Sequence, residues 1–102
     1  MASGEIHVGD VGTAFRLRAK DEADRAVDVS AATKRTLLFL RPTEGLLTKD
    51  ASAYGDGTWL QYVSASGDLS EPGGWKLQGY VEMSGGAWYT DVHKFKVFAN
   101  LR

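Results

Sequence analysis

Residues 75–97, WKLQGYVEMSGGAWYTDVHKFKV, decide the fold class, because apolar side chains recur in them at every second position. A period of two is typical of a β-strand that buries one face. In the first half of the stretch, one phase carries the apolar residues Trp75, Leu77, Val81 and Met83. The sequence Ser-Gly-Gly at 84–86 predicts a hairpin turn. We therefore expect a strand over 75–83, followed by a turn and a second strand.

The second half of this stretch contains a change of phase. Three residues share one phase and two share the opposite one: Trp88, Thr90 and Val92, then Phe95 and Val97. A shift of one residue moves every following side chain to the other face of a sheet. We therefore expect a β-bulge at His93–Lys94, which would return both halves to the same face.

Shorter strand signals precede this stretch, and turn residues separate them. Phe15, Leu17 and Ala19 alternate with polar or basic residues, as in a half-buried strand. Pro42 cannot donate a hydrogen bond to a sheet, so it is expected to end the strand before it. Ser30 is expected to cap a single helical turn over 30–33, and Leu69 is expected to fill the core below its loop. The expected strands lie at about 14–19, 27–29, 36–40, 46–53 and 58–63.

These signals predict an all-β chain, an Ig-like antiparallel β-sandwich of about seven short strands. A small barrel is the less favoured alternative. The 102 residues form one domain, with a core over about 6–98 and short flexible ends at 1–5 and 100–102. The segment Lys20–Arg25 is charged and lacks an apolar stripe, so we expect a hairpin connection there.

Composition excludes several classes of function. The chain has no Cys, which removes disulfides, iron–sulfur clusters and thiol catalysis. Twelve Lys and Arg against 13 Asp and Glu give a net charge of −1, unlike a dedicated nucleic-acid-binding protein. The N-terminal residues do not resemble a secretory signal, and the longest apolar run, 37–40, is too short to cross a membrane. We expect synthesis in the cytoplasm and no membrane partner.

Two groups of residues are candidates for metal sites. The first is a zinc site from His7, Asp10, Asp91 and His93, whose spacing does not specify it. The second is a calcium site from Asp50, Asp56 and Asp68, although the calcium-loop pattern is missing and turn chemistry explains these residues better. No nucleophile, phosphate-loop or carboxylate-pair motif is present. The sequence therefore assigns no catalytic, cofactor-binding or metal-binding residue, and the expected function is non-enzymatic.

Basic and aromatic side chains offer two further surfaces. Strands and strand ends carry seven cations: Arg16, Arg18, Lys34, Arg35, Arg41, Lys94 and Lys96. We favour a solvated outer face for them over a basic face that binds phosphate or an acidic partner. Three tryptophans, Trp59, Trp75 and Trp88, are expected in the core or at an interface. A carbohydrate-binding module would instead use Trp59, Trp88 or Tyr89 as a stacking platform on an exposed sheet.

Several segments together resemble a known family. They are GDVGT at 9–13, VDVSAAT at 27–33, RPTEG at 41–45 and GDLSEPGGW at 67–75. In these segments the chain resembles the small Ig-like domain at the N-terminus of tailed-phage baseplate upper proteins, and related short phage structural proteins. The resemblance covers about 6–98. It departs from the family pattern at Ala32, where a glycine is usual, and in the longer turn at 42–45.

The resemblance implies a bacteriophage virion structural protein, an adapter or assembly module of the tail, baseplate, neck or fibre-attachment region. The partners it implies are other virion proteins, bound in several symmetric copies, and the implied location is the virion. The quoted motifs carry turn and core residues and no catalytic ones. A capsid decoration protein is the first alternative and a carbohydrate-binding module the second. As a further hypothesis, residues 1–5 or 100–102 become ordered against a neighbouring subunit.

Overall fold

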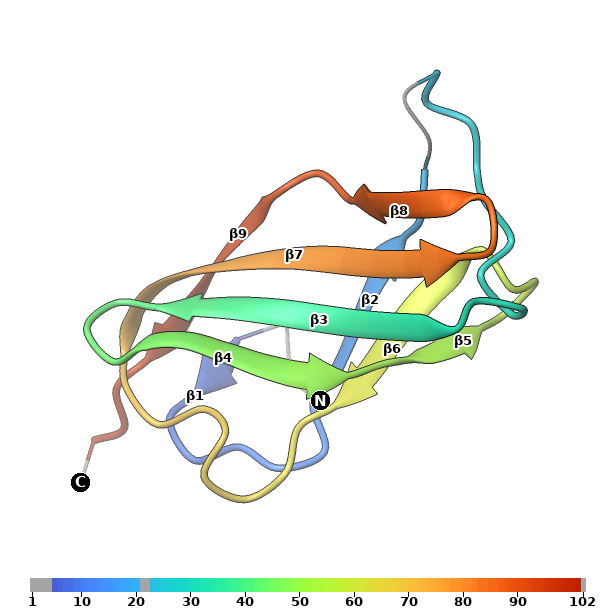
Figure 1. Cartoon of the computed structure of the whole chain (residues 1–102). Coiled ribbons are helices and arrows are strands. Elements are labelled where there is room, and N and C mark those ends of the chain that lie inside the picture. The colour runs from blue at the N-terminus through green and yellow to red at the C-terminus, as the bar shows by residue number, and fades with distance from the viewer. Residues whose placement is uncertain (1–4, 21–22, 102) are drawn as a thin grey trace.

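The computed structural model describes residues 5–20 and 23–101, and these fold into two packed β-sheets (Figure 1). The larger sheet has the strand order β1-β9-β7-β3-β4, with β8 also paired to β7. The smaller sheet has the order β2-β6-β5. The strands are β1 Ile6–His7, β2 Ala14–Arg18, β3 Lys34–Arg41, β4 Gly45–Asp50, β5 Ser52–Tyr54, β6 Trp59–Val63, β7 Gly73–Met83, β8 Gly86–Tyr89 and β9 His93–Phe98.

The all-β sandwich class is confirmed. Strands β2, β6 and β5 form one sheet while β3, β7 and β9 form the centre of the other, a division typical of Ig-like sandwiches. Two details of the expectation are wrong. The described residues form nine strands rather than about seven, and the larger sheet is mixed because β1 runs parallel to β9.

The core lies between the two sheets and follows the period of two. On β7, Trp75, Leu77 and Val81 are buried, as expected, and Trp75 is only 1% exposed. On β2, Phe15 and Leu17 are buried while their neighbours are exposed. Phe15 meets Phe39 of the opposite sheet edge-to-face, with ring centroids 5.1 Å apart. Leu69 is buried at 2% exposure and fills the core below its loop, as expected.

The phase change in the last third is real, but the expected position of the bulge is wrong. Tyr80 pairs with Tyr89 and Leu77 pairs with His93. The two residues of β7 between these pairs therefore face three residues, Thr90–Val92, so the extra residue lies before His93. The Thr90 hydroxyl accepts a hydrogen bond from the Gly79 amide at 2.8 Å, which holds this segment against β7. Val92 was expected on the same face as Trp88. It is 52% exposed and does not follow that alternation.

The segment between β2 and β3 differs from the expectation. Residues 27–29 form no strand; the Val27 amide bonds to the Ala19 carbonyl at 2.9 Å and the Val29 amide to the Gly57 carbonyl at 2.7 Å. Val29 is completely buried and belongs to the core. The expected helical turn at 30–33 is a reverse turn. Its cap is not Ser30 but the Asp28 carboxylate, which accepts from the Ser30 amide and hydroxyl.

Two other boundaries show how strands end. The strand expected over 46–53 is divided between the sheets, since β4 belongs to the larger and β5 to the smaller, with Ala51 between them. Strand β3 ends at Arg41, directly before Pro42, as expected. The end of the chain is less loose than expected at Asn100, whose side chain donates to the Val8 carbonyl at 2.8 Å. Residues 1–4 and 102 lie outside the described part.

Candidate functional site

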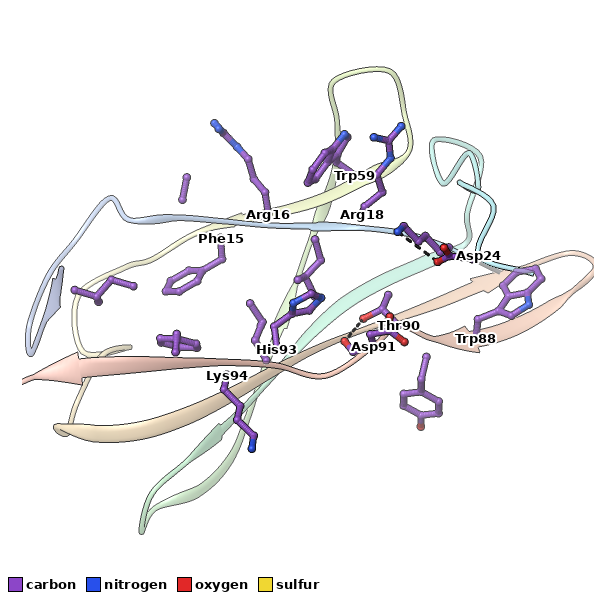
Figure 2. A pocket seen from close by; sticks show the side chains of 17 residues that line it. Phe15, Arg16, Arg18, Asp24, Trp59, Trp88, Thr90, Asp91, His93 and Lys94 are labelled. Carbon is purple, nitrogen blue, oxygen red and sulfur yellow. Dashed lines mark hydrogen bonds and ion pairs between the residues drawn. The ribbon is translucent and has the colours of Figure 1, made fainter. Parts of the chain in front are cut away.

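One side of the sandwich is open and forms a groove of about 630 Å³ (Figure 2). Its two walls are β2, at the edge of the smaller sheet, and the strand ends of β8 and β9 in the larger sheet. Side chains of the core, including Phe15, Leu17 and Phe95, reach into it. Ile6 of β1 lies at one end of the lining. The groove thus runs along one flank of the molecule, beside the interior between the two sheets.

Strand β2 presents an unpaired edge to this groove. It pairs with β6 on one side, and no strand of the described chain pairs with its other side. The Ala19 amide donates to Thr58 at 2.7 Å and the Ser64 amide to Thr13 at 2.9 Å. In an antiparallel pair of strands, the backbone N–H and C=O groups of every second residue point towards the partner strand. In β2, these are the groups of the odd-numbered residues, which point towards β6. The backbone groups of Ala14, Arg16 and Arg18 therefore point out of the free edge.

The opposite wall is less regular. Strand β1 covers only the last part of β9, where Ile6 pairs with Val97 and His7 with Phe98. The extra residue within Thr90–Val92 interrupts the edge between β8 and β9. An irregular edge of this kind is a poor template for a further strand. The regular free edge of the groove is therefore the one on β2.

The described groove lining is more basic than the chain as a whole. It holds four Lys or Arg side chains, Arg16, Arg18, Lys20 and Lys94, but two carboxylates, Asp24 and Asp91. One of these carboxylates is already paired, since Lys20 Nζ lies 3.4 Å from Asp24 Oδ1. His93 projects from β9 towards β2 (Figure 2).

The outer face of the smaller sheet stacks cations on aromatic rings. The Arg16 guanidinium lies 4.1 Å from the centroid of the Tyr54 ring, and that of Arg18 lies 5.2 Å from the Trp59 ring. Arg16 Nε also donates to Gln61 Oε1 at 2.7 Å. These contacts hold both arginines beside the free edge of β2. These arginine–aromatic pairs do not follow from the sequence of β2, because the aromatic partners come from β5 and β6.

The residues considered for zinc do not meet. His7 lies opposite Phe98, at the far end of β9 from His93, so about 16 Å of strand separates the two histidines. His7 Nε2 lies 3.1 Å from Glu5, and Asp10 accepts from the His7 amide at 2.9 Å. Asp91 lines the groove with His93. Among the described residues, no group of three His, Asp or Glu side chains is arranged to hold a metal ion.

The aspartates considered for calcium have separate structural roles. Asp56 accepts from the Thr58 amide and hydroxyl, in the turn chemistry that was expected, and lies 3.6 Å from Arg18. The hydrogen bonds from Thr58 lower the pKa of Asp56. Asp50 is exposed at the end of β4. Asp68 is buried and belongs to a polar cluster that sequence analysis missed.

That cluster joins Asp68, Tyr62 and Lys49. The Tyr62 hydroxyl donates to the Asp68 carboxylate, the Ala65 amide donates to it at 2.7 Å, and Lys49 Nζ lies 3.0 Å from it. Burial by itself raises the pKa of Asp68, but these hydrogen bonds outweigh burial and lower it. The hydrogen bond with Asp68 raises the pKa of Lys49. Burial, followed by the bond to Asp68, raises the pKa of Tyr62. The cluster anchors the loop that follows β6.

The seven cations considered together do not form one basic face. Lys94 and Lys96 lie on the outer face of the larger sheet, where Lys94 is opposite Lys76. Arg16 and Arg18 lie on the smaller sheet. Arg35 donates to the Val29 carbonyl at 2.9 Å, and Arg41 bonds within its turn to the Gly45 carbonyl at 3.1 Å. Lys34 begins β3.

The aromatic residues that a carbohydrate-binding module would use are Trp59, Trp88 and Tyr89. Trp59 lies on the outer face of the smaller sheet beneath Arg18. Trp88 lines the groove. Tyr89 is on the outer face of the larger sheet, tilted by 43° to its neighbour Tyr80. All three candidate residues line the groove, but the Arg18 guanidinium lies over the Trp59 ring and the Tyr89 ring packs against Tyr80.

Comparison with known proteins identifies no relative. No protein-family model matches the chain, and neither the curated proteins nor the solved structures compared with it include a match. The described residues contain no helix long and apolar enough to cross a membrane.

Proposed function

We propose that this chain is a non-enzymatic structural module of a bacteriophage particle, an adapter in the tail, baseplate, neck or fibre-attachment region. The observation that carries the proposal is the open flank of the sandwich. There the unpaired edge of β2 lies beside apolar side chains, of which Ile6, Trp88 and Phe95 are only half-buried. Unpaired strand edges and exposed apolar side chains are the features by which one β-domain binds another chain.

The sequence motifs support the same proposal. Gly9 and Gly12 of the GDVGT segment adopt φ values of +85° and +89°, which side chains rarely adopt. They shape the turn that leads from β1 into β2. Asp68 and Leu69 of the GDL segment anchor the loop after β6 and fill the core. The residues that carry the resemblance to phage Ig-like domains thus form turns and part of the core of the sandwich.

The groove has the properties expected of a binding surface within a virus particle. Its walls are strands of a packed sandwich, so they are rigid enough to position a neighbouring subunit without a large ordering cost. Its lining combines apolar side chains with charged ones, as the core and rim of protein–protein interfaces do. We infer that other virion proteins, present in several symmetric copies, bind along this flank.

The proposal is tested by mass spectrometry of density-banded particles of the phage that encodes the chain. We expect the chain in purified particles, at a copy number close to that of tail or neck proteins. A copy number comparable to that of the major capsid protein would instead make it a capsid decoration protein. Its absence from purified particles would overturn the assignment to the virion.

A further inference from the structure

We propose that the groove binds an extended, acidic segment of a partner protein, which adds to the free edge of β2 as a further strand. This inference rests on the proposed function, since it names the kind of segment that a neighbouring virion protein inserts. The segment pairs with β2 and not with the edge formed by β8 and β9, because the extra residue within Thr90–Val92 interrupts that edge.

The backbone supplies the first argument. Ala14, Arg16 and Arg18 each direct an amide and a carbonyl out of the free edge, on a strand of five residues. An extended segment laid along β2 pairs with these groups in regular order. Strand addition of this kind derives affinity from main-chain hydrogen bonds and specificity from every second side chain.

The side chains supply the second argument. On an added strand, residues level with Phe15 and Leu17 face the apolar side chains of the groove, whereas their neighbours face outwards beside Arg16 and Arg18. The outward positions are therefore suited to Glu or Asp. Arg16 contacts Gln61 and Tyr54 and forms no ion pair with a carboxylate of the described residues, so its charge is available to an incoming acid.

The same charges argue against β2 of a second copy as the occupant. If two β2 strands paired antiparallel about Arg16, the two Arg16 residues would lie opposite each other. Ala14 would lie opposite Arg18. Like charges directly opposite on neighbouring strands are destabilising, and charged residues on an edge are a common protection against self-pairing. An acidic partner meets no such repulsion.

The test uses the whole chain and a synthetic peptide of about seven residues in which Glu and Val alternate. Binding is measured by calorimetry, and the bound site is located from amide chemical shifts in nuclear magnetic resonance spectra. Two matched peptides serve as controls. One replaces each Glu by Lys, and the other carries N-methyl groups on the amides that would donate to β2.

Matched variants of the protein separate the edge from the charge. Ala14→Pro removes one outward amide of β2, and Ala53→Pro makes the same change on β5, at the other edge of the sheet. Proline is tolerated where the lost amide points away from the neighbouring strand. Arg16→Gln removes one charge without altering the backbone. Thermal unfolding of each variant establishes that it is folded.

We expect the Glu peptide to bind and to shift the amides of Ala14, Arg16 and Arg18. Ala14→Pro and Arg16→Gln should each weaken binding about tenfold, and Ala53→Pro should leave it unchanged. Equal binding of the Lys peptide would overturn the acidic occupant, and unimpaired binding of the N-methylated peptide would overturn strand addition. No binding by any peptide would overturn the inference as a whole. The particle analysis judges the proposed function separately.

Discussion

Lys49 of β4 and Asp68 of the loop after β6 form an ion pair that connects the two sheets, with Nζ and Oδ1 3.0 Å apart. The carboxylate also accepts hydrogen bonds from the Tyr62 hydroxyl and from the Ala65 amide. Breaking an ion pair at a buried, hydrogen-bonded carboxylate costs more free energy than breaking an exposed ion pair on the surface. It makes the loop at 64–69 depend on the charge state of one side chain.

Acidification is expected to destabilise the fold through Asp68. The pKa of Asp68 is lowered in the folded chain from an ordinary value of 3.8. A lowered pKa contributes stability that is complete above the unfolded value and is lost as the pH falls through the folded value. The free energy of unfolding, measured by denaturant titration, should therefore fall below about pH 4.

Asp68→Asn should lose about 1–3 kcal/mol at neutral pH, because it removes the ion pair and weakens the bond from Tyr62. It should also lose less stability than the wild type on acidification. Asp50→Asn changes an exposed carboxylate at the end of β4 and serves as the control. Identical acid dependence of Asp68→Asn and the wild type would show that Asp68 does not govern this transition.

Trp75→Ala is expected to cost about 3–5 kcal/mol in the free energy of unfolding, as for a buried aromatic residue. Trp75 is 1% exposed, packs 5.8 Å from the Phe95 ring centroid, and donates its ring N–H to the Glu71 carbonyl at 3.1 Å. Trp59→Ala, on the outer face of the smaller sheet, is the control and should cost less. A cost below about 1 kcal/mol for Trp75→Ala would contradict its place in the core.

Gly79→Ala should destabilise the fold by about 1–3 kcal/mol through overpacking. A Cβ atom at this position would lie 2.7 Å from Leu60 Cδ1 and 2.9 Å from Thr90 Cγ2. Gly85→Ala, in the hairpin turn, meets nothing within 4 Å and should change stability by less than about 0.5 kcal/mol. Similar melting temperatures for the two variants would mean that Gly79 is not a site of close approach.

A glycan-array screen is expected to detect no binding. Trp59, Trp88 and Tyr89 all line the groove, but the Trp59 ring is stacked with the Arg18 guanidinium and the Tyr89 ring packs against Tyr80, so both rings are already engaged by side chains of the chain itself. Specific binding that is lost in Trp59→Ala or Tyr89→Ala would restore the carbohydrate-binding alternative.

The alternation of apolar residues was enough to predict the buried face of β7 and the class of the fold. It was not enough to place the extra residue near β9, because Thr90 is held by a hydrogen bond to Gly79, which lies far from it in sequence. Nor did alternation reveal that Ala51 separates two strands of different sheets, since the pattern continues across it. A local pattern indicates which face of a strand is buried, whereas the strand's pairing partners depend on the fold of the whole chain.

The groove could not be predicted from the sequence for the same reason. Whether a strand has a free edge depends on how all the other strands pair. Nothing within residues 14–18 shows that β2 will have β6 on one side and no strand on the other. The stacking of Arg16 on Tyr54 joins residues from two strands in the same way. The alternation of Arg16 and Arg18 with apolar residues was the available signal, and it indicated the exposed face of β2 but not its edge.

The parallel pairing of β1 with β9 has a mechanical consequence. The chain enters the larger sheet at Ile6 and leaves it after Phe98, on neighbouring strands that run in the same direction. Tension applied through these two ends pulls the strands past each other, so the hydrogen bonds between them are loaded together and in shear. The bond from Val8 to Phe98 and the bond from Asn100 to Val8 lie in the same loaded zone. The domain therefore resists stretching along the line that joins its two ends.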